Sequence, residues 1–455
     1  MTVTKDIQRL EHSSVKLTLT VGKDDVRSEY DKLITDYSKT IQIPGFRKGK
    51  VPKEVLVRKF GDTLKGEALG HIIENAISEI FEDESFAKED RPLPYSTPQI
   101  QDEPSLDLES DLVFSVAYDV LPQITVGPWK GLEVEVPDAA VSEEDLDREL
   151  EAIRDRNAVV LDKDDGAGAA KGDVVTVNYL ELSDAGEPLA GTERQDFVFT
   201  LGSGYNIYYF DDEITGMQKG ETRDIEKVYP ADFEDTGLAG KTKKIRVTLT
   251  ALKEKQLPTL DDDLAQDVDE KFNTLEELKT DIRERLTKNL DRRLREIQIS
   301  RLLEKIMEST EVDVPESMVR VELESRWRNL ARQFNMDGDR LAEIMGKADT
   351  GALPMMEEWR PEAVKALQSR LIVETLIVNE ALEASDEELE KEYETIAAES
   401  GTPLEEVKKY YEQEQMREYL KEDIKERKLF DRMLAENTIK RGKPEKYLDL
   451  IPKNG

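Results

Sequence analysis

Alternating apolar residues near the start of the chain predict a strand followed by an amphipathic helix. Every second residue from Val15 to Val21 is apolar, which is the period of a strand with one buried face. After Val26, apolar residues follow four, seven and eight positions later, which is the spacing of one helix face. Asp24 or Asp25 is expected to cap that helix. The predicted apolar face consists of Val26, Tyr30, Leu33, Ile34 and Tyr37.

A turn-rich stretch, QIPGFRKGKVP at residues 42–52, interrupts this helical pattern. Its prolines and glycines oppose regular structure, and Pro52 suits the first turn of a new helix. After that helix, the run LVFSVAYDVLP predicts a second strand, which Pro122 ends. Residues 1–122 are therefore predicted to form one α+β domain.

The middle of the chain changes from a linker to a β-rich pattern. Residues 123–168 are expected to hold a short strand (LEVEV) and a helix (SEEDLDRELEAIRDRN), and to end in a turn rich in Gly, Ala and Asp. Across residues 169–254, stretches such as DVVTVNYLEL and KKIRVTLTAL alternate with glycines. This pattern predicts a compact antiparallel β domain.

From residue 255 to 455 the pattern is almost wholly helical. The segments 385–388 (SDEE) and 402–405 (TPLE) are predicted to be capping boxes at helix starts. The helices are long and charged with modest apolar faces, which favours extended arms over a tight globule. The fold class is therefore predicted to be α+β multidomain with an elongated all-α C-terminal domain. Helices are expected near 275–310, 315–335, 361–384, 386–399 and 403–440.

Composition narrows the chemistry that this architecture can carry. The 65 basic and 100 acidic residues give a net charge of −35, which disfavours general affinity for nucleic acids or membranes. The absence of cysteine excludes disulfides, thiolate zinc sites and cysteine nucleophiles. His12 and His71 have no metal-spaced partner, so we expect no metal and no cofactor. The sequence has no secretory h-region and no apolar run of membrane-spanning length, which predicts a cytoplasmic protein without a membrane partner.

Two stretches imitate a nucleotide-binding loop but lack its requirements. GFRKGKV has neither the Gly-x4-Gly spacing nor the Ser/Thr that ligates magnesium. In DTGLAGKT, Asp235 stands where the first glycine belongs, and its carboxylate would repel the phosphates. We therefore expect no ATP binding.

The turn-rich loop is locally basic in an acidic chain. Between residues 47 and 59 there are six basic residues and one acidic residue, a local charge of +5. Such runs are often solvated faces, and an inward-facing Phe46 is the alternative. However, Phe46 stands beside Arg47 and Lys48 with no apolar periodicity to bury it. A basic loop with an aromatic tip favours docking to a phosphate-rich or acidic surface.

Several motifs resemble those of the bacterial trigger factor family, and their order and length agree along nearly the whole chain. GFRKGKVP resembles its ribosome-docking signature, and VTVNYLEL, FVFTLGSG and ITGMQKGE resemble its FKBP-type prolyl isomerase domain. LPTLDDDLAQDV and EVDVPESMV resemble the start and first arm of its chaperone domain. The resemblance implies a ribosome-binding domain at 1–122, an FKBP-like domain with a short helix at 169–254, and a helical substrate-binding domain with arms at 255–455.

The resemblance also implies partners and docking residues. We expect an ATP-independent chaperone that docks beside the exit tunnel of the large ribosomal subunit, where it touches a ribosomal protein and rRNA. Nascent and unfolded polypeptides are its expected clients, and a second copy of the chain is its expected partner off the ribosome. The implied ribosome-binding residues are Gly45, Phe46, Arg47, Lys48, Gly49 and Lys50.

Prolyl isomerisation requires a pocket without titrating groups. Rotation about a peptide bond meets a barrier of about 18–20 kcal/mol, which a dry apolar pocket can lower by holding the twisted amide. The aromatic residues of this segment fit such a pocket, although they would also fill any small β core. By resemblance to FKBP-type domains, the pocket residues are Tyr179, Phe197, Ile207, Phe210 and Phe233.

Two departures from the FKBP pattern bear on that pocket. Tyr208 and Tyr209 replace the glycine that usually precedes the aromatic residue at Phe210, and they could narrow or reshape the pocket floor. The pocket aspartate of eukaryotic FKBPs is also missing, with Leu189 and Ala190 near its place.

The helical region is rich in methionine. Eight of the ten methionines lie beyond residue 255, and flexible thioethers suit surfaces that accept many partners. Ordinary helix packing explains most of them. The candidates for exposed substrate contact are Leu353, Met355 and Met356, which lie in a Gly/Pro setting between helices.

Two alternatives to a ribosome-docking chaperone stay open. One is a stand-alone FKBP-type isomerase whose helices dimerise it, and the other is a holdase that never visits ribosomes. The basic loop argues against the first, because a free isomerase has no use for it, and ribosome co-sedimentation would separate the second.

Overall fold

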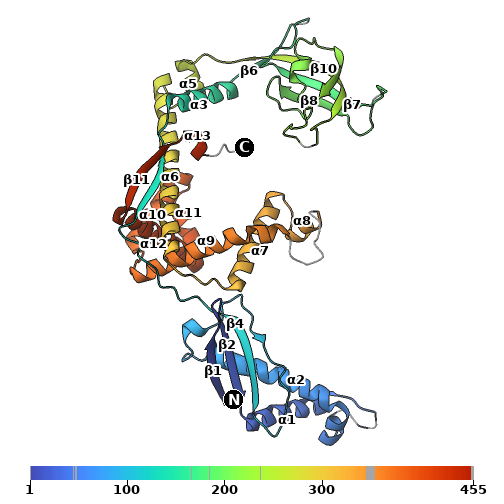
Figure 1. Cartoon of the computed structure of the whole chain (residues 1–455), viewed down its shortest axis with the longest axis vertical. Helices are drawn as coiled ribbons and strands as arrows, with labels where there is room; N and C mark the ends of the chain where they lie inside the picture. Colours follow the sequence, from blue (N-terminus) through green and yellow to red (C-terminus); the bar gives the residue numbers. More distant parts are fainter. Residues whose placement is uncertain are drawn as a thin grey trace. The chain divides into compact units, whose positions relative to one another are not determined.

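The computed structural model forms two compact units, each built from two separate stretches of the chain (Figure 1). The first unit holds residues 1–136 and 295–442, and the second holds residues 137–294 and 443–455. In the described part of the chain, no helix is long and apolar enough to cross a membrane. The structure describes residues 2–44, 46, 49–164, 166–183, 185–235, 237–344 and 354–451.

The first unit begins with an antiparallel sheet packed on two helices. The strand order is β1-β2-β4-β3. The predicted alternation is confirmed, since the residues of β2 are buried at every second position. The elements are β1 (Val3–Arg9), β2 (Ser14–Val21), α1 (Lys23–Thr40), α2 (Lys53–Glu82), η1 (Lys88–Asp90), β3 (Gln99–Ile100) and β4 (Leu112–Asp119).

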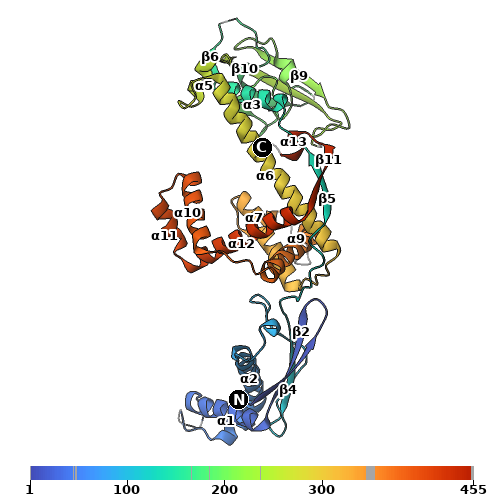
Figure 2. The same ribbon diagram turned by 90° about the vertical axis from the view of Figure 1, so that its left-hand side faces the viewer.

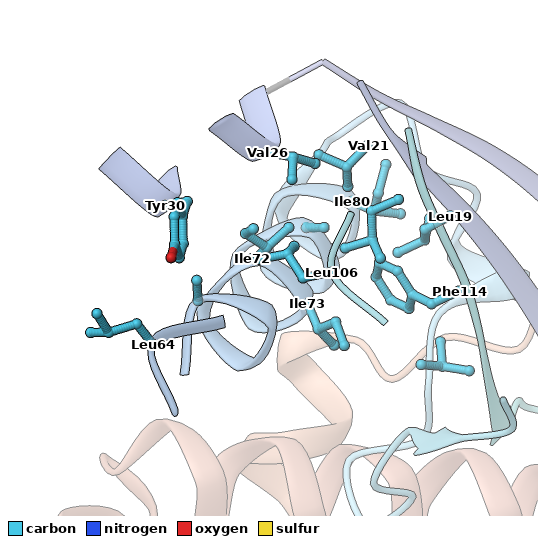
Figure 3. Close-up of a cluster of buried hydrophobic side chains, with 14 of the residues drawn as sticks. Leu19, Val21, Val26, Tyr30, Leu64, Ile72, Ile73, Ile80, Leu106 and Phe114 are labelled. Carbon is cyan, nitrogen blue, oxygen red and sulfur yellow. The ribbon is translucent and has the colours of Figure 1, made fainter. Parts of the chain in front are cut away.

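One apolar cluster joins this sheet to α1 and α2. Figure 3 shows Leu19 and Phe114 of the sheet in the same cluster as Ile72 and Ile80 of α2. Fully burying such a side chain contributes roughly 1.5–3 kcal/mol. Phe60 has non-helical dihedrals (φ −131°, ψ 16°), which kink α2 between its basic first turns and its buried remainder.

The predicted apolar face of α1 is buried or half-buried, but its predicted cap is wrong. The helix begins at Lys23, with Gly22 at the N-cap position and no side-chain capping bond. Asp24 and Asp25 therefore lie inside the first turn, too late to cap the helix. There their charges favour the positive end of the helix dipole.

The rest of the first unit is mainly helical. Pro361 lies inside α9, so that helix begins earlier than predicted. The predicted helix at 403–440 is wrong, because it is broken into α11 and α12 and ends before the strand β11, which pairs with β5 (Figure 2). The elements are β5 (Glu133–Asp138), α6 (Leu275–Glu308), α7 (Glu316–Gln333), α8 (Gly338–Ile344), α9 (Pro354–Asn379), α10 (Asp386–Ser400), α11 (Leu404–Tyr411), α12 (Glu414–Glu436) and β11 (Thr438–Pro444), with β5, α6 and β11 crossing into the second unit.

Of the two predicted capping boxes, one is confirmed. The Ser385 hydroxyl accepts a hydrogen bond from the Glu388 amide at 3.3 Å, and the Glu388 carboxylate accepts one from the Ser385 amide at 2.8 Å. The box at Thr402 is wrong. Pro403 has extended backbone (φ −56°, ψ 135°) and occupies the N-cap position itself, so Thr402 lies one residue too early.

The second unit holds an antiparallel sheet with a short helix. Its strand order is β6-β10-β7-β8, with β9 also paired to β10. Together the units confirm the α+β multidomain prediction, with an antiparallel β domain and a helical C-terminal region. The elements are α3 (Glu143–Arg156), β6 (Val159–Asp162), β7 (Val174–Leu182), β8 (Arg194–Thr200), α4 (Asp211–Ile214), β9 (Thr222–Val228), β10 (Thr242–Gln256), α5 (Asp262–Val268) and α13 (Tyr447–Leu450).

Candidate functional sites

The basic loop between α1 and α2 is anchored at both ends. Ile43 and Val51 are each 5% exposed and belong to the core of the sheet and helices. Between them the Phe46 side chain is 38% exposed, so the inward-facing alternative does not hold. Gly49 has φ +77°, a left-handed conformation that a side chain would strain. The predicted docking residues Gly45, Arg47 and Lys48 lie outside the described residues.

The cations that follow Phe46 are exposed. Lys50, Lys53, Arg58 and Lys59 all reach solvent. Lys53 Nζ lies 3.9 Å from Asp31 Oδ1, a surface pair worth about 0–1 kcal/mol. Within the described residues, no ion pair joins Lys50, Arg58 or Lys59 to a carboxylate. Three of these four described cations are therefore free to meet a partner.

In the second unit, Tyr179 of β7 is the centre of an aromatic cluster. Its side chain is 3% exposed, and its ring centroid lies 5.7 Å from that of Phe197 and 5.5 Å from that of Phe210. Both pairs meet edge to face, the arrangement that the ring quadrupoles favour. Phe199, an aromatic residue of this segment outside the five placed by the FKBP resemblance, adds a ring 6.0 Å from Phe210. Three of the five predicted pocket residues therefore come together.

The other two predicted pocket residues lie apart from this centre. Phe233 reaches it through Tyr229, with ring centroids 5.1 Å apart. Ile207 is 56% exposed and lies outside the buried cluster. The apolar set thus divides into a buried wall and an exposed rim.

The tyrosine pair before Phe210 splits between these two regions. Tyr208 is 8% exposed and packs 5.9 Å from Tyr179, while its hydroxyl donates to Glu181 Oε2 at 3.3 Å. Burial and the neighbouring Glu181 raise the pKa of Tyr208 to about 12. Tyr209 is 39% exposed with φ +50°, and its ring meets Phe233 at 5.3 Å.

A buried polar network positions the turn that carries these tyrosines. Asn206 is 2% exposed, and its Nδ2 donates to Asp211 Oδ2 at 2.6 Å. Asn206 Oδ1 accepts from the Phe210 amide at 2.9 Å, and Asp211 Oδ1 accepts from the Gly202 amide at 2.7 Å. Sequence reasoning missed this network and Glu181, although the strand period places Glu181 on the same face as Tyr179.

The methionines at the start of α9 are half-buried. Met355 and Met356 pack against a small cluster that includes Trp327, Trp359 and Leu341. Leu353 lies outside the described residues.

Comparison with known proteins matches three families along the chain. Residues 1–153 match bacterial trigger factor protein, residues 166–251 match FKBP-type peptidyl-prolyl cis-trans isomerase, and residues 274–435 match the trigger factor C-terminus.

Whole-length relatives agree with these matches. The trigger factor of Treponema denticola is 45% identical over 98% of this chain and 99% of its own. Those of Treponema pallidum and Borrelia turicatae are 36% and 32% identical over 99% and 98% of this chain, and 99% and 97% of their own. The chain therefore belongs to the trigger factor family, ribosome-docking chaperones that carry an FKBP-type peptidyl-prolyl isomerase domain.

Proposed function

We propose that the loop at residues 42–52 and the first turns of α2 dock this chaperone beside the exit tunnel of the large ribosomal subunit. Phe46 would insert against a ribosomal protein, while Lys50 and its neighbouring cations meet rRNA phosphates. The observation that supports this role is an aromatic side chain held exposed between two buried anchors, Ile43 and Val51. Gly45, Arg47, Lys48 and Gly49 complete the proposed docking set.

Ribosome co-sedimentation of the full chain tests the docking role. Phe46→Ala should weaken binding by roughly tenfold, because aromatic anchors dominate many interfaces. The triple change Phe46→Ala/Arg47→Ala/Lys48→Ala should weaken it further. Phe334→Ala removes a side chain that is 57% exposed elsewhere, so it serves as a matched control. Co-sedimentation that survives the triple change would instead favour a stand-alone isomerase or a holdase that does not visit ribosomes.

For the isomerase domain, we propose that the aromatic cluster holds a proline-containing segment. Tyr179, Phe197 and Phe210 would form the wall of the pocket, Ile207 its rim, and Phe233 its far side. Ring faces that exclude water would favour the twisted amide, in which conjugation and charge separation are lost. This mechanism requires no acid, base or cofactor.

A proline-peptide isomerisation assay on the full chain tests the pocket. Ile207→Ala should lower kcat/KM roughly fivefold, as expected from the loss of about 1 kcal/mol of apolar contact. Val198→Ala is the matched control, because Val198 is 57% exposed and alternates away from Phe197 and Phe199 along β8. If the wild-type chain does not accelerate isomerisation, the domain is a binding module only.

The remaining roles are proposed for whole segments. Residues 1–122 would act as the docking domain, 123–168 as a linker, 169–254 as the isomerase, and 255–455 as the polypeptide-binding arms, with Leu353, Met355 and Met356 among the contacts. Because we expect no nucleotide cycle, release would depend on low affinity at each apolar patch. We further propose a cytoplasmic location and self-association into a homodimer off the ribosome.

A further inference from the structure

A cation lies beside the aromatic cluster of the isomerase domain, and the proposed pocket does not use it. β7 and β8 pair in one sheet (Figure 1), and their register places Arg194 directly opposite Tyr179. Directly opposite residues of an antiparallel pair share one face of the sheet, with Cβ atoms about 4.5–5.5 Å apart. Arg194 therefore borders the ring at the centre of the aromatic cluster, while the residue itself is exposed to solvent.

The charge of Arg194 acts on two tyrosines of this cluster. Burial raises the pKa of Tyr179, and the Arg194 guanidinium opposes that rise. Burial and the neighbouring Glu181 raise the pKa of Tyr208 to about 12, against the same guanidinium. Both phenols therefore keep their protons at neutral pH, and neither of them neutralises the cation.

The charges around this cluster leave Arg194 without an anionic partner. Glu181 of β7 already forms an ion pair with Lys243 of β10. Arg194 Nη1 donates to the backbone carbonyl of Glu193 at 3.1 Å, and within the described residues no carboxylate forms an ion pair with the guanidinium. A guanidinium has five N–H donors, so most of its hydrogen-bonding capacity stays available.

This unpaired cation is a local exception in an acidic chain. The net charge of −35 repels acidic polypeptides from the molecule as a whole. Beside the aromatic cluster, however, the Arg194 guanidinium offers a planar fork that matches the two oxygens of a carboxylate. An exposed cation next to a buried apolar wall can therefore distinguish ligands by the charge that flanks their apolar part.

We propose that Arg194 is a specificity-determining residue of the isomerase, which selects an acidic side chain next to the proline of the bound segment. With the proline ring against Tyr179, the carboxylate of an adjacent Asp or Glu would reach the guanidinium. A basic neighbour would be repelled, and a neutral one would gain no ion pair. The inference rests on the proposed function, because it takes the aromatic cluster as the proline pocket.

Cis/trans exchange of short capped peptides, measured by NMR with the full chain, tests this selectivity. One series of peptides varies the residue before the proline, the other varies the residue after it, and each series carries Glu, Gln or Lys there. In at least one series, kcat/KM for Glu should exceed that for Gln by about two- to fivefold, the range of an exposed ion pair. The Lys peptide should fall below the Gln peptide.

Two further properties identify the preference as a charge contact. The difference between Glu and Gln should lie in KM, because the ion pair forms in the bound ground state and in the transition state alike. It should also shrink at high salt, since screening weakens the attraction between exposed charges.

Variants at Arg194 are compared through the Glu/Gln ratio of kcat/KM, in which any general loss of activity cancels. Arg194→Gln should bring the ratio to about one, Arg194→Lys should keep most of the preference, and Arg194→Glu should make Lys the favoured residue. Arg194 is exposed, so these changes open no cavity in the core. Lys219→Gln removes the same charge from an exposed turn of the same domain, and as the matched control it should keep the wild-type ratio.

The possible failures of this inference and of the pocket have different signatures. Equal rates for Glu, Gln and Lys peptides in both series, with acceleration of all three, would overturn the selectivity and leave the pocket in place. A Glu/Gln ratio that Arg194→Gln does not lower, or that Lys219→Gln lowers equally, would remove Arg194 from the role. If the wild-type chain accelerates none of the peptides, both the proposed pocket and its selectivity are wrong.

Discussion

At the scale of single residues, Tyr208 and Tyr209 show how the backbone conformation places two identical side chains in different surroundings. Tyr208 points into the core and becomes part of the wall around Tyr179. Tyr209 has φ +50°, which turns its ring out toward Phe233. Lys227 Nζ donates to the Tyr209 carbonyl and helps to hold this left-handed residue, a conformation that costs about 1–2 kcal/mol.

The buried phenol of Tyr208 makes the stability of this domain sensitive to high pH. Its pKa is raised to about 12 in the folded chain, against the ordinary value of 10.0. A raised tyrosine pKa contributes stability below pH 10.0 that is lost as pH rises toward 12. Urea unfolding should therefore show that wild type loses more stability across this range than Tyr208→Phe.

Tyr229 supplies the control for that measurement. Its pKa is also raised to about 12, mainly by burial, while its hydroxyl donates to the Tyr208 carbonyl at 2.7 Å. Because that bond ends on the backbone, it persists in Tyr208→Phe, and a Tyr229→Phe variant should remove a comparable share of the alkaline sensitivity. If wild type, Tyr208→Phe and Tyr229→Phe all lose the same stability as the pH rises, these two phenols are not the source of the alkaline sensitivity.

At the scale of secondary structure elements, the start of α10 provides a matched pair of substitutions. The Ser385 capping box is closed, and hydrogen bonds from Lys428 and from the Ser385 amide hold the pKa of Glu388 at about 2. Ser385→Ala should lower the free energy of unfolding by about 1 kcal/mol, the usual value of an N-cap. Thr402→Ala should have no such effect, because Thr402 lies outside its helix. Chemical denaturation followed by circular dichroism measures both, and equal effects would contradict the cap assignment.

The elements that sequence reasoning predicts are those whose own residues determine them. The alternation in β7 and β10, the periodic face of α1, and the box at Ser385 are all local signals, and each is present in the structure. Caps at Asp24 and Thr402 failed because a shift of one or two residues decides whether a side chain reaches the first free amides.

The missed elements depend on partners far along the chain. The strand TIKRGKP (β11) has a weak pattern of its own and forms because β5 lies beside it. Asn437 ends α12 there, since its Oδ1 accepts from the Leu132 amide at 2.7 Å and its Nδ2 donates to the Trp129 carbonyl at 3.0 Å. A pattern within one stretch cannot show a partner about 300 residues away.

At the scale of the whole molecule, the candidate sites differ in how much the sequence reveals. The docking loop was visible because charge and turn residues are local properties, and Phe46 is exposed as its lack of periodicity indicates. A cavity lined by Tyr30 and Ile34 of α1, Val57 of α2 and Leu108 was not visible in the sequence, because it arises only where these three segments meet. Likewise, residues 1–136 and 295–442 belong to one unit of the structure. No change in composition along the chain marks this pairing.

The charge of the whole molecule determines how docking should respond to salt. At a net charge of −35 the body repels rRNA, so the local cations must supply the attraction. At physiological ionic strength the screening length is about 8 Å, which limits the attraction to cations close to phosphates. Lys50→Gln should therefore reduce the slope of log affinity against log salt by about 0.7–0.9, the value for one phosphate contact.

The same charge change elsewhere serves as the control for this salt titration. Lys288 is exposed on α6, so Lys288→Gln alters the net charge equally but removes no docking cation. In ribosome binding measured across a salt series, Lys288→Gln should give the same slope of log affinity against log salt as wild type. If both variants shift the slope alike, the net charge of the body controls docking; if neither does, Phe46 and apolar contact carry it without phosphates. Only a change confined to Lys50→Gln agrees with a loop whose cations neutralise rRNA phosphates one by one.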